Sequence, residues 1–189
     1  MGSSQSRFSE LTEDILDEYI MLTYLSKSEI LHLYKTFGQL EAQGQLRDLN
    51  FRFPPQAIET IFPQIKYNPF RDRIYSVFSS QKDGRMSFED VLDLCSAMSE
   101  KCPDRVKAEW AFQIYDFDED GYVGEQDISC VIDRLTGDCG YLTEAEHDQI
   151  IKTLMNEMDL ESSGKISVQS FSHAVGKMSE FPHSFNFRF

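Results

Sequence analysis

The 189-residue chain lacks the features that would point to a membrane-spanning, nucleic-acid-binding or catalytic protein. No apolar run approaches the roughly 20 residues that a membrane span needs. No cluster of Lys and Arg offsets the formal net charge of −14, so the surface would repel nucleic acid. There is no phosphate-binding glycine loop and no Gly-x-Ser-x-Gly, and the four histidines show no ligand spacing. We therefore expect a non-enzymatic protein whose partners are cations or basic surfaces.

Cysteine is also scarce and shows no zinc-type pairing. The four cysteines are Cys95, Cys102, Cys130 and Cys139. The N-terminal stretch MGSSQSRFSE is polar and does not look like a secretory signal. We therefore expect reduced thiols in the cytosol, most of them filling the core.

Two segments of the chain repeat one pattern. DFDEDGYVGEQD (116–127) and DLESSGKISVQS (159–170) each have glycine at the sixth position. Apolar residues stand eight, five, four and one residue before each segment, which is one face of a helix. Val123 and Ile166 share the eighth position, where a short strand would pair the two loops. The sequence predicts helix, twelve-residue loop and helix, twice over.

The same template extends upstream. The segment SSQKDGRMSFED (79–90) also has glycine at its sixth position. A still earlier copy fits if its loop contains an insertion of about eight residues, which places Phe53 at the eighth loop position. The outgoing helix of that first copy would present Ile58, Ile61, Phe62 and Ile65 on one face. We predict an all-α fold of four helix–loop–helix units in two paired lobes, with a count of three units as the alternative, because the first loop lacks the acidic residues of the third. The predicted segments are an N-terminal segment (1–25), the first pair (26–100), the second pair (101–178) and an aromatic tail (179–189).

The third loop carries the EF-hand pattern D-x-[DN]-x-[DN]-G with an acid at position twelve, which wraps oxygens around calcium. The predicted ligands are Asp116, Asp118, Asp120, the Tyr122 carbonyl and Asp127. Aspartate at position twelve is shorter than glutamate, and the loss of one oxygen favours the six-coordination of magnesium. We expect one site for Ca²⁺ or Mg²⁺ here.

The other loops have lost ligands. The corresponding positions of the fourth loop are Asp159, Glu161, Ser163, Lys165 and Ser170, and Ser170 cannot supply two carboxylate oxygens. Because affinity follows ligand charge, we expect weak or no metal binding there. The second loop begins with Ser79 and retains only two acids, Asp83 and Asp90, and the first loop retains none.

The two ends of the chain carry further signals. The start fits M-G-x-x-x-[ST], which predicts myristoylation of Gly2. The last nine residues hold four phenylalanines, too apolar a tail to remain in water. Phe181, Phe185 and Phe189 are spaced as one helical face. We predict that they dock in a groove of the second EF-hand pair and that a partner helix displaces them.

Nearly end to end, the chain resembles the calcium- and integrin-binding family of EF-hand proteins. The resemblance lies in MGSSQSR, LTYLSKSEIL, NPFRDRI, SFEDVLDL, AFQIYDFDEDG, DRLTG and SFNFRF. It implies four EF-hands with the first two silent, a myristoylated N-terminus and a hydrophobic groove that binds amphipathic helices. The implied partners are cytoplasmic tails of integrin α subunits, with channel subunits and kinases as others. The family's fourth hand usually ends in Glu, where this chain has Ser170.

These features predict an adaptor that binds Ca²⁺ or Mg²⁺ and clamps an amphipathic helix from the cytoplasmic tail of a membrane receptor. The alternative is a calcineurin B-like regulatory subunit of an enzyme, although such subunits usually keep more working loops. A calcium buffer is disfavoured by the lost ligands. We expect a cytoplasmic protein held at the inner face of the plasma membrane through myristate.

Overall fold

The computed structural model describes residues 11–41, 48–137, 142–178 and 181. Over those residues the fold is all-α, as predicted, and β pairing is limited to two isolated bridges. None of the described helices is long and apolar enough to cross a membrane. Three of the four cysteines fall in the described ranges, and Cys95, Cys102 and Cys130 are free thiols.

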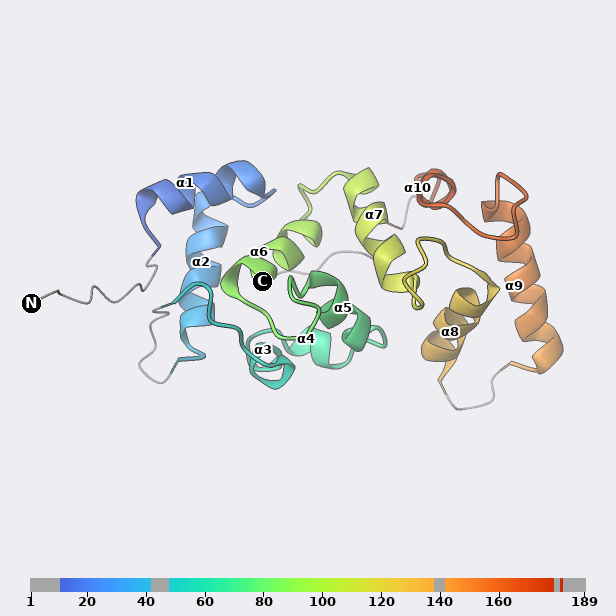
Figure 1. Cartoon of the computed structure of the whole chain (residues 1–189), viewed down its shortest axis with the longest axis horizontal. Helices are drawn as coiled ribbons and strands as arrows, with labels where there is room; N and C mark the ends of the chain where they lie inside the picture. The colour runs from blue at the N-terminus through green and yellow to red at the C-terminus, as the bar shows by residue number, and fades with distance from the viewer. Residues whose placement is uncertain (1–10, 42–47, 138–141, 179–180, 182–189) are drawn as a thin grey trace, which may run out of the picture.

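The described helices follow one another in an elongated arrangement, with α1 and α2 at one end and α8 and α9 at the other (Figure 1). They are α1 (Glu13–Leu22), α2 (Lys27–Gly38), α3 (Pro55–Ile61), α4 (Pro63–Lys66), α5 (Arg71–Phe78), α6 (Phe88–Ala97), α7 (Asp104–Tyr115), α8 (Glu125–Thr136), α9 (Glu144–Met158) and α10 (Val168–Val175).

Isolated bridges join the loops in pairs at their eighth positions. Val123 and Ile166 exchange backbone hydrogen bonds of 3.0 and 2.9 Å, which is the predicted loop pairing. Phe53 and Met86 exchange two bonds of 2.9 Å in the same way. The second bridge places Phe53 at the eighth position of a first loop, so four loops pair within the described ranges and the three-unit alternative is wrong.

In the second and third loops, the acid at position twelve also caps the helix that follows the loop. Ser87 is the N-cap of α6, and Asp90 accepts the Ser87 N–H at 2.8 Å. Gly124 is the N-cap of α8, and Asp127 accepts the Gly124 N–H at 2.9 Å. Such bonds satisfy donors that a helix leaves unpaired at its first turn. Position twelve therefore stabilises the fold independently of any metal.

The segment that leaves the first loop is not one continuous helix but two short ones, α3 and α4. The sequence predicts a single helix through Ile58, Ile61, Phe62 and Ile65, but α3 ends at Ile61 and α4 begins at Pro63. Proline has no N–H to donate and its ring clashes with the preceding turn, so the helix breaks there. Ile58, Phe62 and Ile65 are nevertheless buried, because the chain resumes a helical turn after the break.

Helix α1 is an element that the sequence prediction did not include. It falls within the 1–25 segment, and its Leu16 and Tyr19 are buried in the core of the first pair. Thr12 caps it by accepting the Ile15 N–H at 3.3 Å. The spacing of Ile15, Leu16, Tyr19 and Ile20 is a helical signal that was present in the sequence.

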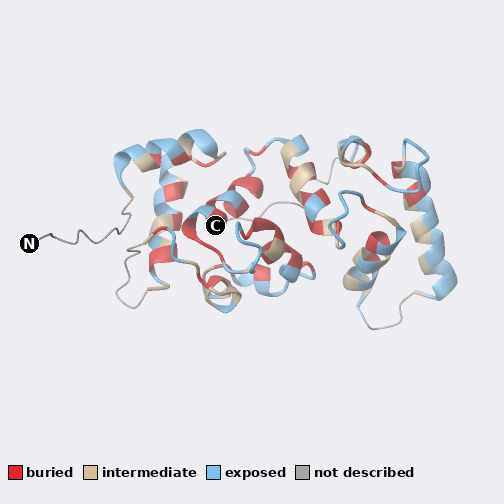
Figure 2. Cartoon of the chain, viewed as in Figure 1, coloured by how far each residue is buried: buried red, intermediate tan, exposed pale blue. Residues whose placement is uncertain are grey.

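Buried side chains form two hydrophobic clusters, one spanning Leu16 to Met98 together with Ile114, and one spanning Ala108 to Val175. Buried residues are dense on α5, α6 and α7 (Figure 2). Tyr115, at the end of α7, packs against both clusters, and its ring contacts Phe70 of the first cluster with centroids 5.2 Å apart. Helix α7 therefore connects the two lobes and leads directly into the third loop.

Candidate metal centre

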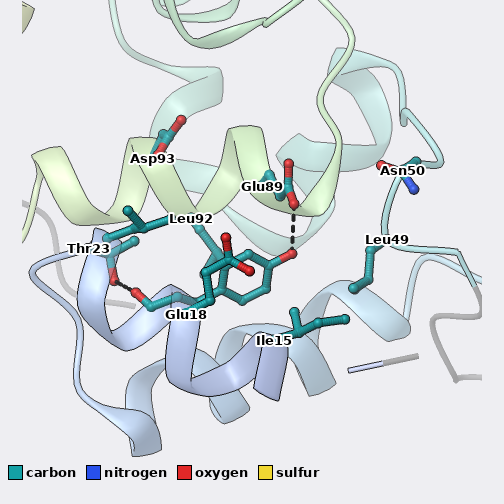
Figure 3. A pocket seen from close by; sticks show the side chains of 10 residues that line it. Ile15, Glu18, Thr23, Leu49, Asn50, Glu89, Leu92 and Asp93 are labelled. Atoms are coloured by element: carbon teal, nitrogen blue, oxygen red, sulfur yellow. Dashed lines mark hydrogen bonds between the residues drawn. The ribbon is translucent and has the colours of Figure 1, made fainter. Parts of the chain in front are cut away.

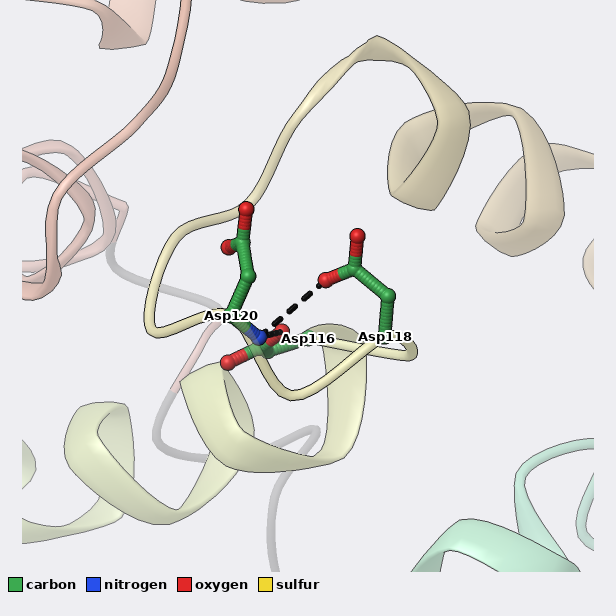
Figure 4. Close-up of side chains that lie close together, drawn as sticks. All are labelled: Asp116, Asp118 and Asp120. Carbon is green, nitrogen blue, oxygen red and sulfur yellow. Dashed lines mark hydrogen bonds between the residues drawn. The ribbon is translucent and has the colours of Figure 1, made fainter.

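The third loop, residues 116–127, reverses the chain between α7 and α8. Glu119 at position four and Gly121 at position six have positive φ angles of 57° and 85°. Glycine adopts the second of these without steric cost, because it has no Cβ. The reversal gathers the side chains of Asp116, Asp118 and Asp120 in one small volume (Figure 4).

Carboxylate oxygens of these three aspartates lie within 4.8 Å of one another. Asp116 is buried, and burial raises the pKa of its carboxyl above the usual value. It accepts the N–H groups of Asp120 at 3.2 Å and Gly121 at 3.0 Å. Carboxylates this close repel one another, and a hard divalent cation relieves that repulsion. The arrangement is chemically suited to chelating Ca²⁺ or Mg²⁺.

Asp127 and Tyr122 flank this cluster. Both oxygens of Asp127 accept backbone N–H groups at 2.9 Å, one from Phe117 and one from Gly124. The cluster of three carboxylates found among the described residues does not include Asp127. Tyr122, whose carbonyl is the predicted seventh-position ligand, donates its N–H to Asp120 at 2.9 Å. The backbone thus fixes Asp127 beside the loop, at the first turn of α8.

A lysine from the fourth loop reaches into the third. The Lys165 ammonium forms an ion pair with Asp120 and lies 5.5 Å from the centroid of the Tyr122 ring. This hydrogen bond lowers the pKa of Asp120 and raises that of Lys165. The sequence suggested only a backbone role for Lys165, as the seventh residue of its own loop. Its side chain instead competes for a predicted metal ligand of the neighbouring loop.

The fourth loop shares the backbone of the third but uses its polar groups internally. Gly164 has a φ of 81°, and Asp159 accepts the N–H groups of Ser163 at 3.1 Å and Gly164 at 2.7 Å. The Ser163 hydroxyl donates to the Lys165 carbonyl at 2.8 Å. The oxygen at position seven is therefore already engaged by the loop itself.

The remaining positions of the fourth loop also find partners within the loop. Glu161 accepts a hydrogen bond from the Ser167 hydroxyl at 3.1 Å. Ser170, at position twelve, is buried and lies 3.2 Å from the same hydroxyl. Only Asp159 and Glu161 supply carboxylates at its predicted ligand positions, against four aspartates in the third loop.

An arginine of the first lobe supports the third loop from behind. Arg73 of α5 is buried and donates to the carbonyls of Gln113 at 2.9 Å, Ile114 at 3.3 Å and Asp116 at 2.6 Å. It also pairs with Glu119 at 3.1 Å. These carbonyls end α7, where a helix leaves acceptors unpaired and favours a cation. Arg73 is a positioning residue that the sequence pattern did not reveal.

A second arginine joins the same junction. The guanidinium of Arg134 in α8 lies 4.7 Å from the centroid of the Phe117 ring. The guanidinium of Arg73 lies 5.7 Å from the same centroid. Arg134 donates to Asp72 of α5 at 2.9 Å and to the Pro69 carbonyl at 3.1 Å. The second residue of the third loop is thus held by cations from both lobes, which ties the conformation of the loop to the lobe interface.

The predicted tail residues are only partly described. Phe181 packs against the hydrophobic cluster of the second pair, and Phe185 and Phe189 lie outside the described residues, as does Gly2. Phe181 lines a pocket of about 260 Å³ with Asp104 and Arg105 of α7 and with residues at the end of α10, among them Val175.

A separate pocket lies on the first lobe. It has a volume of about 380 Å³ and is lined by α1, α6 and residues 49 and 50 of the first loop (Figure 3). Glu18, Glu89 and Asp93 contribute carboxylates to its wall, and the Tyr19 hydroxyl donates to Glu89 at 2.9 Å. The sequence pattern did not predict this acid-lined pocket.

Comparison with known proteins agrees with the geometry. The EF-hand domain pair family matches residues 105–176. Calcium and integrin-binding family member 2 of Drosophila melanogaster is 35% identical over 185 residues, covering 94% of this chain and 95% of the relative. Members 2 and 3 of the same family from Homo sapiens are 31% and 32% identical over 193 and 192 residues, covering both chains fully.

Loops of this geometry, paired through their eighth residues between helices, define an EF-hand protein. The chain belongs to the calcium and integrin-binding family. It is accordingly a calcium-binding EF-hand protein rather than an enzyme.

Proposed function

We propose that this protein is an adaptor that binds Ca²⁺ or Mg²⁺ and clamps an amphipathic helix from the cytoplasmic tail of a membrane receptor, an integrin α subunit in the first instance. The carrying observation is full-length similarity to relatives named for binding calcium and integrin. Channel subunits and kinases are further candidate partners of the same chemistry. Nothing in the comparisons favours the calcineurin B-like alternative.

The proposed metal ligands are the side chains of Asp116, Asp118, Asp120 and Asp127 and the carbonyl of Tyr122. The clustered carboxylates support the first three. Asp127 would act from the start of α8 after releasing its backbone hydrogen bonds. We propose that this is the single tight site of the chain and that cellular Mg²⁺ competes for it, because aspartate at position twelve favours six-coordination.

Replacing Lys165 is expected to tighten this site. Lys165→Gln removes the ammonium group that pairs with Asp120. An incoming metal ion then no longer has to break this ion pair in order to bind Asp120. The ion pair is partly exposed and solvent screens it, so we expect affinity for Ca²⁺ to rise only modestly, by up to about five-fold. Calorimetric titration measures this, with Lys152→Gln on the exposed face of α9 as the charge-matched control. An unchanged or weaker affinity in Lys165→Gln would contradict the competition.

We also propose a peripheral location at the inner face of the plasma membrane, through myristate on Gly2. The M-G-x-x-x-[ST] start supports it. Co-expression with an N-myristoyltransferase should add the mass of one acyl chain, and Gly2→Ala should prevent the addition. An unchanged mass in the presence of active transferase would exclude the modification.

The tail is proposed to occupy the helix-binding groove until a partner displaces it. The packing of Phe181 on the second cluster supports this. Deleting residues 181–189 should tighten binding of an integrin α tail peptide, because each buried Phe that must be displaced opposes binding by about 1.5–3 kcal/mol. Fluorescence anisotropy of a labelled peptide measures the affinity.

A scrambled peptide of the same composition is the control, because it retains charge and apolarity but not the amphipathic face. If the full chain binds the integrin α tail peptide and the scrambled peptide with equal affinity, the adaptor proposal is wrong. Weaker peptide binding after the deletion would instead make the tail part of the binding surface, leaving the adaptor function intact but ending its role as a plug.

A further inference from the structure

The second EF-hand loop, residues 79–90, is filled by an arginine side chain. Arg52 of the first loop donates from Nη2 to Ser79 Oγ at 2.8 Å, Asp83 Oδ1 at 2.9 Å and the Arg85 carbonyl at 2.6 Å. From Nη1 it donates to Asp90 Oδ2 at 2.8 Å. These acceptors stand at positions one, five, seven and twelve of the loop, which are four of the positions that supply oxygens to Ca²⁺ in an EF-hand.

The loop around this arginine has the backbone of the third loop. Lys82 and Gly84, at positions four and six, have φ angles of 56° and 73°, matching Glu119 and Gly121. Asp90 accepts N–H groups from positions two and nine, Ser80 at 3.1 Å and Ser87 at 2.8 Å. Asp127 accepts from the same two positions of the third loop. The second loop is therefore folded as a cation-binding loop, not as a collapsed remnant.

The side chain of Arg52 lies inside the second loop, not on its surface. This side chain is only 12% exposed, and that of Asp90 is 5% exposed. One guanidinium carries one positive charge and five N–H donors in a planar fork, so it offsets carboxylate charge and satisfies several oxygens at once. The guanidinium bridges the carboxylates of Asp83 and Asp90, and its positive charge offsets theirs.

We propose that Arg52 is the built-in cation of the second EF-hand loop: it takes the place of the metal ion, keeps the loop folded without one, and excludes divalent cations from it. The first lobe is then permanently in its cation-bound form. Removing the guanidinium uncovers a latent site for a divalent cation, made of Ser79, Asp83, the Arg85 carbonyl and Asp90.

The second lobe contains a weaker version of the same arrangement. Arg52 precedes Phe53, and Lys165 precedes Ile166, so both stand at position seven of the loop whose eighth residue makes the bridge. Each reaches the position-five acid of the facing loop, Asp83 or Asp120. The Lys165 side chain is 50% exposed, whereas Arg52 is enclosed. The difference explains why one loop stays available to metal and the other does not.

The test follows the amide of Gly84, at position six of the second loop, in ¹⁵N–¹H spectra during a Ca²⁺ titration. In the wild-type chain this resonance should not respond up to about 10 mM Ca²⁺. In Arg52→Met it should shift saturably, with a dissociation constant of about 10⁻⁴–10⁻³ M for a site with only two carboxylates. Gly121 reports the third loop in the same spectra, so the two sites are separated.

Arg85→Met is the matched control. Arg85 is exposed and its guanidinium donates to the Arg52 carbonyl at 3.0 Å, outside the ring of ligand atoms. The change removes the same charge from the same loop pair but leaves Arg52 in place, so Gly84 should remain unresponsive. Arg52→Lys should also remain unresponsive, because the ammonium still supplies a positive charge.

If Arg52→Met folds without metal, either of two results would overturn the proposal: a Gly84 shift of equal size in wild type and Arg52→Met, or a Gly84 that does not move in Arg52→Met. If Arg52→Met is unfolded without metal, circular dichroism decides. Ca²⁺ should then restore its helicity, and should fail to restore it in the double variant Arg52→Met with Asp90→Asn. Absence of rescue in the single variant would equally overturn the assignment.

Discussion

Asp116→Ala is expected to abolish tight Ca²⁺ binding by this protein. The residue is the proposed first ligand of the third loop, and it also accepts the N–H groups of Asp120 and Gly121 that shape the turn. Mutation of outer-shell partners already weakens metal sites 10–100-fold, so loss of a direct carboxylate ligand should cost at least about 100-fold. Calorimetric titration with Ca²⁺, and with Ca²⁺ in the presence of Mg²⁺, measures the loss.

The matched control is Asp159→Ala, the same change at the same position of the fourth loop. That loop has only two carboxylates at its ligand positions and already uses Ser163 and Glu161 internally, so the variant should bind Ca²⁺ like the wild type. Asp116→Asn separates charge from shape, because the amide retains an acceptor for the Gly121 N–H. Two equivalent high-affinity sites in the wild-type chain would contradict the one-site expectation.

Arg73→Ala is expected to destabilise the protein much more than a change at its exposed neighbour Arg71. The guanidinium is 10% exposed and satisfies three carbonyls at the end of α7, which are left without their donor in the variant. Leaving such groups unpaired, together with loss of a charged donor, should lower the free energy of unfolding by about 3 kcal/mol. Urea denaturation followed by circular dichroism measures it.

Arg71→Ala provides a control in the same helix. Arg71 is about half exposed and pairs loosely with Glu59 at 3.6 Å, so its loss should change the free energy of unfolding by less than about 1 kcal/mol. Arg73→Lys should recover only part of the loss, because an ammonium cannot reproduce the planar fork. Equal effects of Arg71→Ala and Arg73→Ala would show that the contacts of Arg73 do not stabilise the junction.

Much of the fold follows from local patterns in the chain. The phase of apolar residues around Gly121 and Gly164 specifies the helices, and a twelve-residue loop has few ways to turn between them. The pairing of Val123 with Ile166 follows from the same count. Pro63 should also have ended a helix in the prediction, and the spacing within 15–20 should have revealed α1, since both signals are local.

The three basic side chains that decide how the loops behave could not be obtained in this way. Arg52 meets Asp83, Lys165 meets Asp120, and Arg73 meets the end of α7 and Glu119, across separations of 31 to 46 residues. A periodic pattern records which face of a helix is buried, but not which charge lies opposite a given carboxylate once two loops pair or two lobes meet. Ligand counting along each loop therefore identifies where a cation fits, whereas packing between loops and lobes determines whether that cation is a metal ion or a side chain of the protein.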